Sequence, residues 1–254
     1  MPLAKNAWVR LDHGEIEEFT AGYIGFLEKV KTERETIEYL IEKAEAEGFK
    51  EIGSVKALDP GSKVYSVFKE KSFIAAVIGE KRVSEGIRLI AAHADSPRLD
   101  LKPVPLGADE DANLAFFKVA WYGGFFLYQW ANTPLALRGV VVRGDEKIKV
   151  KSDEKGIVFI APELLIHLSK ERLNRKLKEV VKGEELKPLL INKLGEGEKL
   201  KEKALKVLKE LYGIEEKDLF TSDLELVPAL PPLEVGLDKS LIAGYGQDDR
   251  VCVY

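Results

Sequence analysis

Two side chains with metal-binding chemistry stand close together at the end of an apolar run. The run Ile87–Ala92 is broken only by Arg88, which is typical of a buried strand. His93 follows it directly, at the position where open α/β sheets place their ligands. Asp95 can hydrogen-bond the far imidazole nitrogen and determine which nitrogen faces a metal. A capped strand end in a solvated turn would show the same His-x-Asp pattern, so both interpretations stay open.

A pair of adjacent carboxylates, Asp248 and Asp249, follows a glycine turn at Gly246. Aspartate in such a position favours a helix N-terminus, because it caps free amide groups and interacts well with the helix dipole. The functional alternative is that one carboxylate bridges two metal ions while its neighbour supports it from outside the ligand set. The local pattern alone is compatible with either interpretation.

The composition indicates a globular protein. The chain has 254 residues, 45% of them hydrophobic and 32% charged, and no stretch is apolar enough to span a bilayer. Its single cysteine, Cys252, excludes an internal disulfide framework and predicts a reducing, cytoplasmic location. The net charge of -4 gives no reason to expect nucleic acid as a partner. Abundant Lys and Glu with scarce Cys and Met resemble a thermophile protein.

The residues before His93 predict two amphipathic helices and then strands. Thr32 with Glu35 has the form of a capping box for the second helix. Apolar spacing and turn residues place the two helices and two strands at 14–30, 33–47, 63–69 and 72–78. This order is typical of an α/β or α+β domain.

After Lys102 the pattern becomes mainly β. Lysines alternate with Ile and Val over 145–152, which indicates a half-buried or edge strand. The other strands are expected at 114–122, 135–143 and 219–227. Helical spacing predicts helices at 163–181 and 198–212.

Several motifs in the same order resemble the aspartyl aminopeptidase family of cytosolic metallo-exopeptidases. They are AAHADSPRLDLKPVPL, YGGFFLYQW with PLALRGVVV, APELLIHL, LELVPALPPLEVGLDKSLI and GYGQDDRVCVY. The resemblance implies an α/β fold: a zinc-peptidase-type α/β domain interrupted by a mainly β dimerisation domain. Residues 1–100 and 233–254 would form the peptidase domain, incomplete at its carboxyl end, and 101–232 the inserted dimerisation and assembly domain.

The resemblance also implies residue roles. His93 would be a zinc ligand, Asp95 its orienting partner, and Asp248 the carboxylate that bridges two zinc ions. By similarity to other two-zinc peptidases, the Asp248–Asp249 peptide bond is expected to be cis. His167, in APELLIHL, resembles a histidine that crosses a dimer interface to steady the substrate carbonyl in the neighbouring active site. Without the family, an interior helical histidine with local partners is the alternative.

One departure from the family concerns the rest of the zinc site. The family places a catalytic Glu-Glu pair, another acidic ligand and a final histidine after the DDR motif, whereas this chain has only three histidines, His13, His93 and His167. One histidine and one bridging aspartate are too few for the usual four-coordinate zinc shell. We therefore expect this chain to be the front portion of a longer peptidase, inactive alone.

Three functions stay open from the sequence. The first is a metallo-aminopeptidase that releases amino-terminal Asp or Glu from peptides with two zinc ions, forms a homo-oligomer through the inserted domain, and obtains its missing ligands from further sequence or a second chain. The second is a non-catalytic assembly or regulatory module. The third is a mononuclear hydrolase that uses His93, Asp95 and Asp248. No membrane partner is expected.

Overall fold

The protein forms two compact units in the computed structural model, which describes residues 6–254. The first unit comprises the described residues up to Ser96 together with Pro231–Tyr254, and the second comprises Pro97–Leu230. Residues 1–5 of the predicted peptidase segment lie outside the described residues. The mixed α/β class is confirmed. The peptidase and dimerisation roles assigned to the two segments stay predictions.

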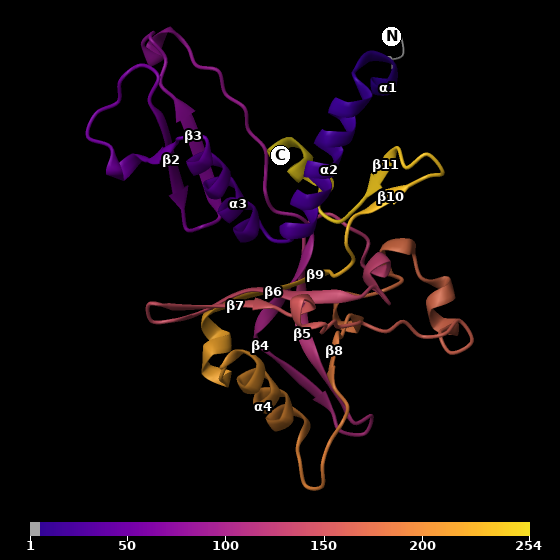
Figure 1. The fold of residues 1–254 in the computed structure, drawn as a ribbon. Coiled ribbons are helices and arrows are strands. Elements are labelled where there is room, and N and C mark those ends of the chain that lie inside the picture. The colour runs from indigo at the N-terminus through magenta and orange to yellow at the C-terminus, as the bar shows by residue number, and fades with distance from the viewer. Residues whose placement is uncertain (1–5) are drawn as a thin grey trace. The chain divides into compact units, whose positions relative to one another are not determined.

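The first unit contains helices, a small sheet and a short ribbon (Figure 1). β2 pairs antiparallel with β3 and parallel with β1, while β10 and β11 form a separate antiparallel ribbon. The two helices and two strands predicted before residue 79 are confirmed to within a residue at each end. In chain order its elements are α1 (Ala7–Arg10), α2 (His13–Lys29), α3 (Glu33–Ala46), β1 (Lys50–Glu51), β2 (Lys63–Phe68), β3 (Ser72–Val77), β10 (Leu233–Val235), β11 (Leu241–Ala243) and α5 (Gln247–Val253).

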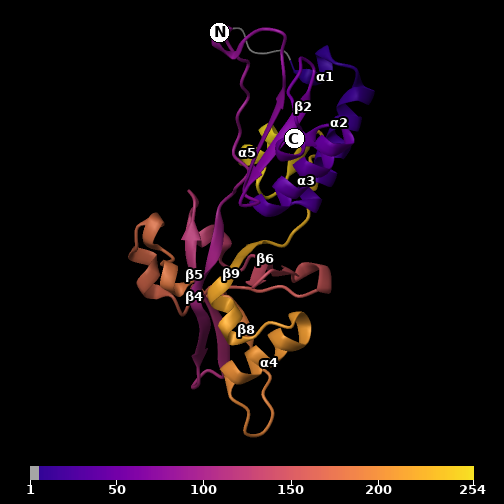
Figure 2. The same cartoon turned by 90° about the vertical axis from the view of Figure 1, so that its left-hand side faces the viewer.

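Local capping and an apolar cluster explain how these helices form. The Asp12 carboxylate accepts a hydrogen bond from the Glu15 amide at 3.2 Å and begins α2. Thr32 begins α3 through the predicted capping box. Beside α2 lies α5, the helix that carries the aspartate pair (Figures 1 and 2). The apolar cluster that joins them consists of Tyr23, Phe26, Leu27 and Val30, with Tyr39, Ile242 and Val253 packed against it.

The predicted buried strand over Ile87–Ala92 is wrong. The run has no regular secondary structure, and Ile90 is 92% exposed. A strand requires a neighbour that pairs with its amide and carbonyl groups. Among residues 6–254, no strand pairs with this run. The apolar composition therefore marks a segment that can be buried, while no surface within the described residues covers it.

The second unit is built on a six-stranded sheet in the order β7-β6-β9-β4-β5-β8. Its neighbouring strands pair antiparallel, and β7 lies at an edge, as its alternating lysines predicted. β9 starts later than expected, because a 3-10 helix, η8 (Glu216–Thr221), occupies the preceding residues. The strands are β4 (Arg98–Asp109), β5 (Leu114–Tyr122), β6 (Leu135–Arg143), β7 (Glu146–Lys151), β8 (Leu189–Ile191) and β9 (Ser222–Pro228).

The helix α4 (Leu200–Tyr212) covers part of this sheet (Figure 2). It contacts β4, β5 and β8 through a buried stripe that includes Leu200, Ala204 and Leu208. Gly213 ends it in the left-handed conformation, with φ of 69°. Among the helices of residues 6–254, none is both long and apolar enough to cross a bilayer.

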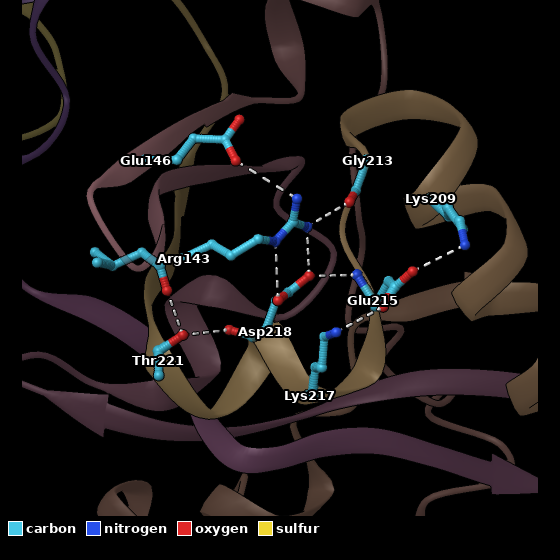
Figure 3. Close-up of polar contacts among 9 residues, drawn as sticks. Arg143, Glu146, Lys209, Gly213, Glu215, Lys217, Asp218 and Thr221 are labelled. Carbon is cyan, nitrogen blue, oxygen red and sulfur yellow. Dashed lines mark hydrogen bonds and ion pairs between the residues drawn. The ribbon is translucent and has the colours of Figure 1, made fainter.

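A guanidinium joins three elements of the second unit (Figure 3). Arg143, at the end of β6, donates to both carboxylate oxygens of Asp218 at 3.2 and 2.6 Å. It also donates to the Gly213 carbonyl at 2.7 Å, which satisfies a backbone acceptor at the end of α4. The Glu215 amide donates to Asp218 at 2.8 Å. This network holds the turn between α4 and β9 against the sheet.

The helix predicted over 163–181 is also wrong. The segment contains irregular turns and short 3-10 helices, η5 (Lys170–Asn174) and η6 (Leu177–Glu179). An amphipathic helix gains most of its stability by packing its apolar face. Here Leu165 and Leu168, on the expected apolar face, are exposed. Helical spacing without a surface to pack on did not produce a continuous helix.

Candidate functional site

His93 lies in the first unit on a segment without regular secondary structure, with about half of its side chain exposed. Its Nδ1 lies 3.0 Å from the backbone carbonyl oxygen of Asp95 and 3.4 Å from the Asp95 carboxylate. The carbonyl is therefore the nearer acceptor for a proton on Nδ1. Asp95 thus contacts the ring nitrogen mainly through its backbone carbonyl, and its role as the orienting partner stays a prediction.

The carboxylates at 248 and 249 do not cap a regular helix. Gly246 precedes them with φ of 79°, and neither aspartate has helical backbone angles. No side chain caps the start of α5. The Asp248–Asp249 peptide bond is cis, as expected from the resemblance to two-zinc peptidases. The structure therefore does not support the helix-cap interpretation of these two residues.

The structure brings His93 and Asp248 together from distant parts of the sequence. The His93 Nε2 atom lies 3.2 Å from the Asp248 carboxylate. The His93 amide also faces the Asp249 carboxylate at 3.4 Å. With Nδ1 facing Asp95, Nε2 faces the Asp248 carboxylate, so a proton or a metal cation can lie between the two atoms. The expected convergence of imidazole and carboxylate is present, and their roles as metal ligands stay a prediction.

Nearby charges and hydrogen bonds shift the pKa values of His93 and of a neighbouring thiol. Partial burial lowers the pKa of His93, but the Asp95 carbonyl and the carboxylates of Asp95 and Asp248 outweigh it, so the net pKa is raised. A hydrogen bond to Asp249 raises the pKa of the exposed Cys252 thiol. Because a metal must displace a proton from the imidazole, binding at this pair would weaken at acid pH.

The separation of the two donor atoms can be compared with the geometry of a zinc site. Two ligands held at about 2.0–2.1 Å around one tetrahedral zinc ion lie about 3.3 Å apart. The His93–Asp248 separation of 3.2 Å fits two such positions. Within residues 6–254, no group of three or more His, Cys, Asp and Glu side chains is arranged to hold a metal. The separation of the two donor atoms is thus compatible with two positions on one zinc ion, and the ligand roles stay a prediction.

His167, the remaining predicted site residue, lies in the second unit in an exposed turn. It is therefore not the interior helical histidine of the alternative interpretation. Sequence reasoning missed Ser96 and Arg250, which both contact the site segment. The Ser96 hydroxyl donates to the Asp248 carbonyl at 3.2 Å, and Arg250 donates to that hydroxyl at 3.2 Å. In the sequence, the feature that could have indicated Arg250 is its position directly after the two aspartates and before an apolar segment.

Known proteins with similar sequences belong to one family. A profile described as the aminopeptidase I zinc metalloproteases (M18) matches residues 26–254. A probable M18 family aminopeptidase 1 from Thermotoga neapolitana is 43% identical over 256 residues, and one from Borrelia garinii is 42% identical over 261 residues. Each match covers 98% of this chain and 56% of the relative. The chain therefore spans little more than half the length of these relatives.

Solved structures agree with the sequence matches. The crystal structure of an M18 family aminopeptidase from Thermotoga maritima aligns with a TM-score of 0.91 at 40% identity, over 98% of this chain and 56% of that one. The structure of aminopeptidase I from Borrelia burgdorferi aligns with a TM-score of 0.84 at 38% identity. Because the family profile matches residues 26–254, most of this chain, the chain belongs to the M18 peptidase family, the aminopeptidase I zinc metalloproteases.

Proposed function

We propose that this chain is the front portion of a zinc-dependent aminopeptidase that releases amino-terminal Asp or Glu from peptides. The observation that carries the proposal is the approach of His93 Nε2 to the Asp248 carboxylate, 3.2 Å, in a chain of the M18 family. A neutral imidazole nitrogen and a carboxylate oxygen are both common zinc ligands. Their convergence from distant parts of the sequence supports a shared cation.

In the proposed site Asp248 would hold two zinc ions and His93 would hold one of them. Because each zinc ion takes four ligands, this pair would fill two positions on one ion and one on the other, and further residues would supply the rest. The relatives' additional length, with only 56% of each covered, supports this division. When bound, zinc would lower the pKa of a water molecule and polarise the peptide carbonyl.

Other residues of the chain prepare these ligands. The Asp95 carbonyl, 3.0 Å from His93 Nδ1, holds the ring so that Nε2 faces the Asp248 carboxylate. His167 is proposed to reach the active site of a second copy and steady the substrate carbonyl there. Its exposure leaves the imidazole accessible to such a neighbour.

We further propose that copies of the chain assemble through the segment 101–232, in the cytoplasm. The support is an exposed apolar group around His167 that includes Leu164, Leu165 and Leu168. Contiguous exposed apolar side chains commonly mark protein interfaces. The exposed thiol of Cys252 supports a reducing location.

A chimeric enzyme tests the proposed activity. The chain is joined to the part of the Thermotoga maritima relative that its match leaves uncovered, and release of p-nitroaniline is measured from Asp, Glu and Leu p-nitroanilides. We expect release from the acidic substrates to exceed release from the Leu substrate more than about tenfold, and to stop after chelation. Asp248→Asn should reduce the rate at least about 100-fold. The matched control, Asp238→Asn, changes another aspartate of the same unit and should leave the rate unchanged.

Two results would contradict separate parts of this proposal. A folded chimera that releases Leu as fast as Asp would contradict the proposed specificity for acidic residues. Activity that survives both chelation and Asp248→Asn would contradict the proposed zinc site.

A further inference from the structure

Arg250 is the largest fully buried side chain among residues 6–254. It lies two residues after Asp248, on the segment that carries the proposed metal-binding pair, yet none of its side chain reaches the surface. Taking a guanidinium out of water is costly unless polar groups surround it. The position of its hydrogen-bond acceptors therefore indicates what the residue does.

The first acceptor lies at the end of a helix. Arg250 Nη1 donates to the Val30 carbonyl at 2.7 Å, and Val30 is the C-cap residue that directly follows α2. The last carbonyls of a helix lack partners within it and carry partial negative charge. A buried cation at this point satisfies one of them. Arg250 thereby ties the α5 segment to the rigid end of a long helix.

The second acceptor leads to the proposed site. Arg250 Nη2 donates to the Ser96 hydroxyl at 3.2 Å, and that hydroxyl donates to the Asp248 carbonyl at 3.2 Å. Ser96 is itself buried and lies three residues after His93. One serine therefore connects the two segments whose side chains meet at 3.2 Å between His93 and Asp248.

The backbone around Arg250 is shaped to admit this arrangement. Gly246 has φ of 79°, a conformation that favours glycine, and a Cβ atom there would overlap the Arg250 guanidinium. The guanidinium carbon also lies 5.1 Å from the centroid of the Tyr245 ring, within cation–π range. The turn before the aspartate pair is thus packed around the arginine.

The run directly before His93 has no strand pairing within residues 6–254. The residues from Ile87 to Ala92 are exposed and pair with no strand among residues 6–254. Side chains and backbone of the 245–250 segment therefore supply much of what locates the imidazole. The contacts through Ser96 are the buried part of that attachment.

We propose that Arg250, acting through Ser96, is a positioning residue that sets the approach of the Asp248 carboxylate to His93. This inference deepens the proposed function and rests on it, since the pair is the proposed part of the zinc site. Arg250 is neither a ligand nor the basic residue that reads an acidic substrate, because its side chain is fully buried and directed to Val30 and Ser96.

The test follows the imidazole nitrogens of the metal-free 254-residue chain by ¹⁵N NMR at one fixed pH. Only three histidines contribute signals, so His13 and His167 serve as internal controls. Asp248→Asn defines the displacement of the His93 signals when the carboxylate is lost. We expect Ser96→Ala to produce at least half of that displacement, and Ser96→Thr, which restores a hydroxyl, to return the signals toward the wild-type position.

Two further variants separate positioning from general damage to the fold. Ser152→Ala removes another buried serine hydroxyl, one that accepts from the Leu137 amide at 2.8 Å in the second unit, and should leave the His93 signals in place. Arg250→Lys keeps the charge with a single donor group, so we expect an intermediate displacement of His93 with His13 unchanged.

The outcomes distinguish this inference from the proposed function. If Asp248→Asn moves the His93 signals while Ser96→Ala and Arg250→Lys do not, the positioning role is overturned and the pair remains. If Asp248→Asn leaves the His93 signals in place, the pair does not form in solution, and both the positioning role and the observation that carries the proposed function are overturned.

Discussion

Replacing Asp218 with asparagine should destabilise the second unit at neutral pH and much less at acid pH. The hydrogen bond from Arg143 and that from the Glu215 amide lower the pKa of Asp218 from 3.8 to about 2. A depressed folded-state pKa stabilises the fold above the unfolded-state value, where the carboxylate is charged in both states. That stabilisation is lost as the pH falls through about 2, so the relevant window lies between about pH 4 and pH 2.

The contacts give the size of the effect. At about 1.4 kcal/mol for each pH unit between the two pKa values, the upper limit at pH 7 is about 2.5 kcal/mol. The Asp218 side chain is only 4% exposed, but its partner Arg143 is 39% exposed, so solvent screens the pair. We therefore expect Asp218→Asn to lower the free energy of unfolding by about 1 to 2 kcal/mol at pH 7, and by about half as much at pH 3.

Urea denaturation of both proteins across this pH range measures the difference directly. Other titrating groups are common to both chains and largely cancel in the comparison. The matched control is Glu216→Gln, an exposed carboxylate of the same 3-10 helix, which should change the free energy of unfolding by less than about 0.5 kcal/mol. An Asp218→Asn effect that keeps its full size down to pH 3 would refute the electrostatic reasoning.

Three smaller changes test other parts of the structure. Thr32→Ala removes the cap of α3 and should cost about 1 kcal/mol in a thermal denaturation experiment; no loss would show that the cap is dispensable. Gly139→Ala should cost at least about 2 kcal/mol in urea, because φ is 128° and a Cβ would overlap the Asp223 carbonyl, whereas Gly144→Ala, at φ of 60° in open space, should cost less. Ile90→Ser should stay within about 0.5 kcal/mol in urea, because Ile90 is 92% exposed; a loss of about 2 kcal/mol would show that the run is buried in solution.

The elements that could be predicted from the sequence are those whose signals lie within the element itself. Thr32 and Glu35 form their capping box from residues three apart, and α3 begins where that motif places it. The alternating lysines of β7 likewise indicated an edge strand before its neighbours were known. Such signals need no knowledge of the rest of the fold.

The two failed elements depended on a surface elsewhere. The run Ile87–Ala92 has the composition of a buried strand, and residues 163–181 have helical spacing. Composition and spacing indicate only which side chains an element would bury if another surface covered it. In both segments the apolar side chains are exposed, Ile90 and Leu168 among them. A partner surface, rather than a stronger local pattern, is what these segments lack within the described residues.

In the candidate site, the residues with reactive side chains could be predicted, whereas the backbone contacts that support them could not. His93 and Asp248 were predicted because their types and motifs carry chemistry, and they do lie side by side. Three of their supporting contacts run to carbonyl oxygens: that of Asp95 faces His93 Nδ1, that of Val30 accepts from Arg250, and that of Asp248 itself accepts from Ser96. Every residue has a carbonyl, so no pattern of residue types marks the ones that hold a site in place. Arg250 and Ser96 became recognisable only once the fold had placed those acceptors around them.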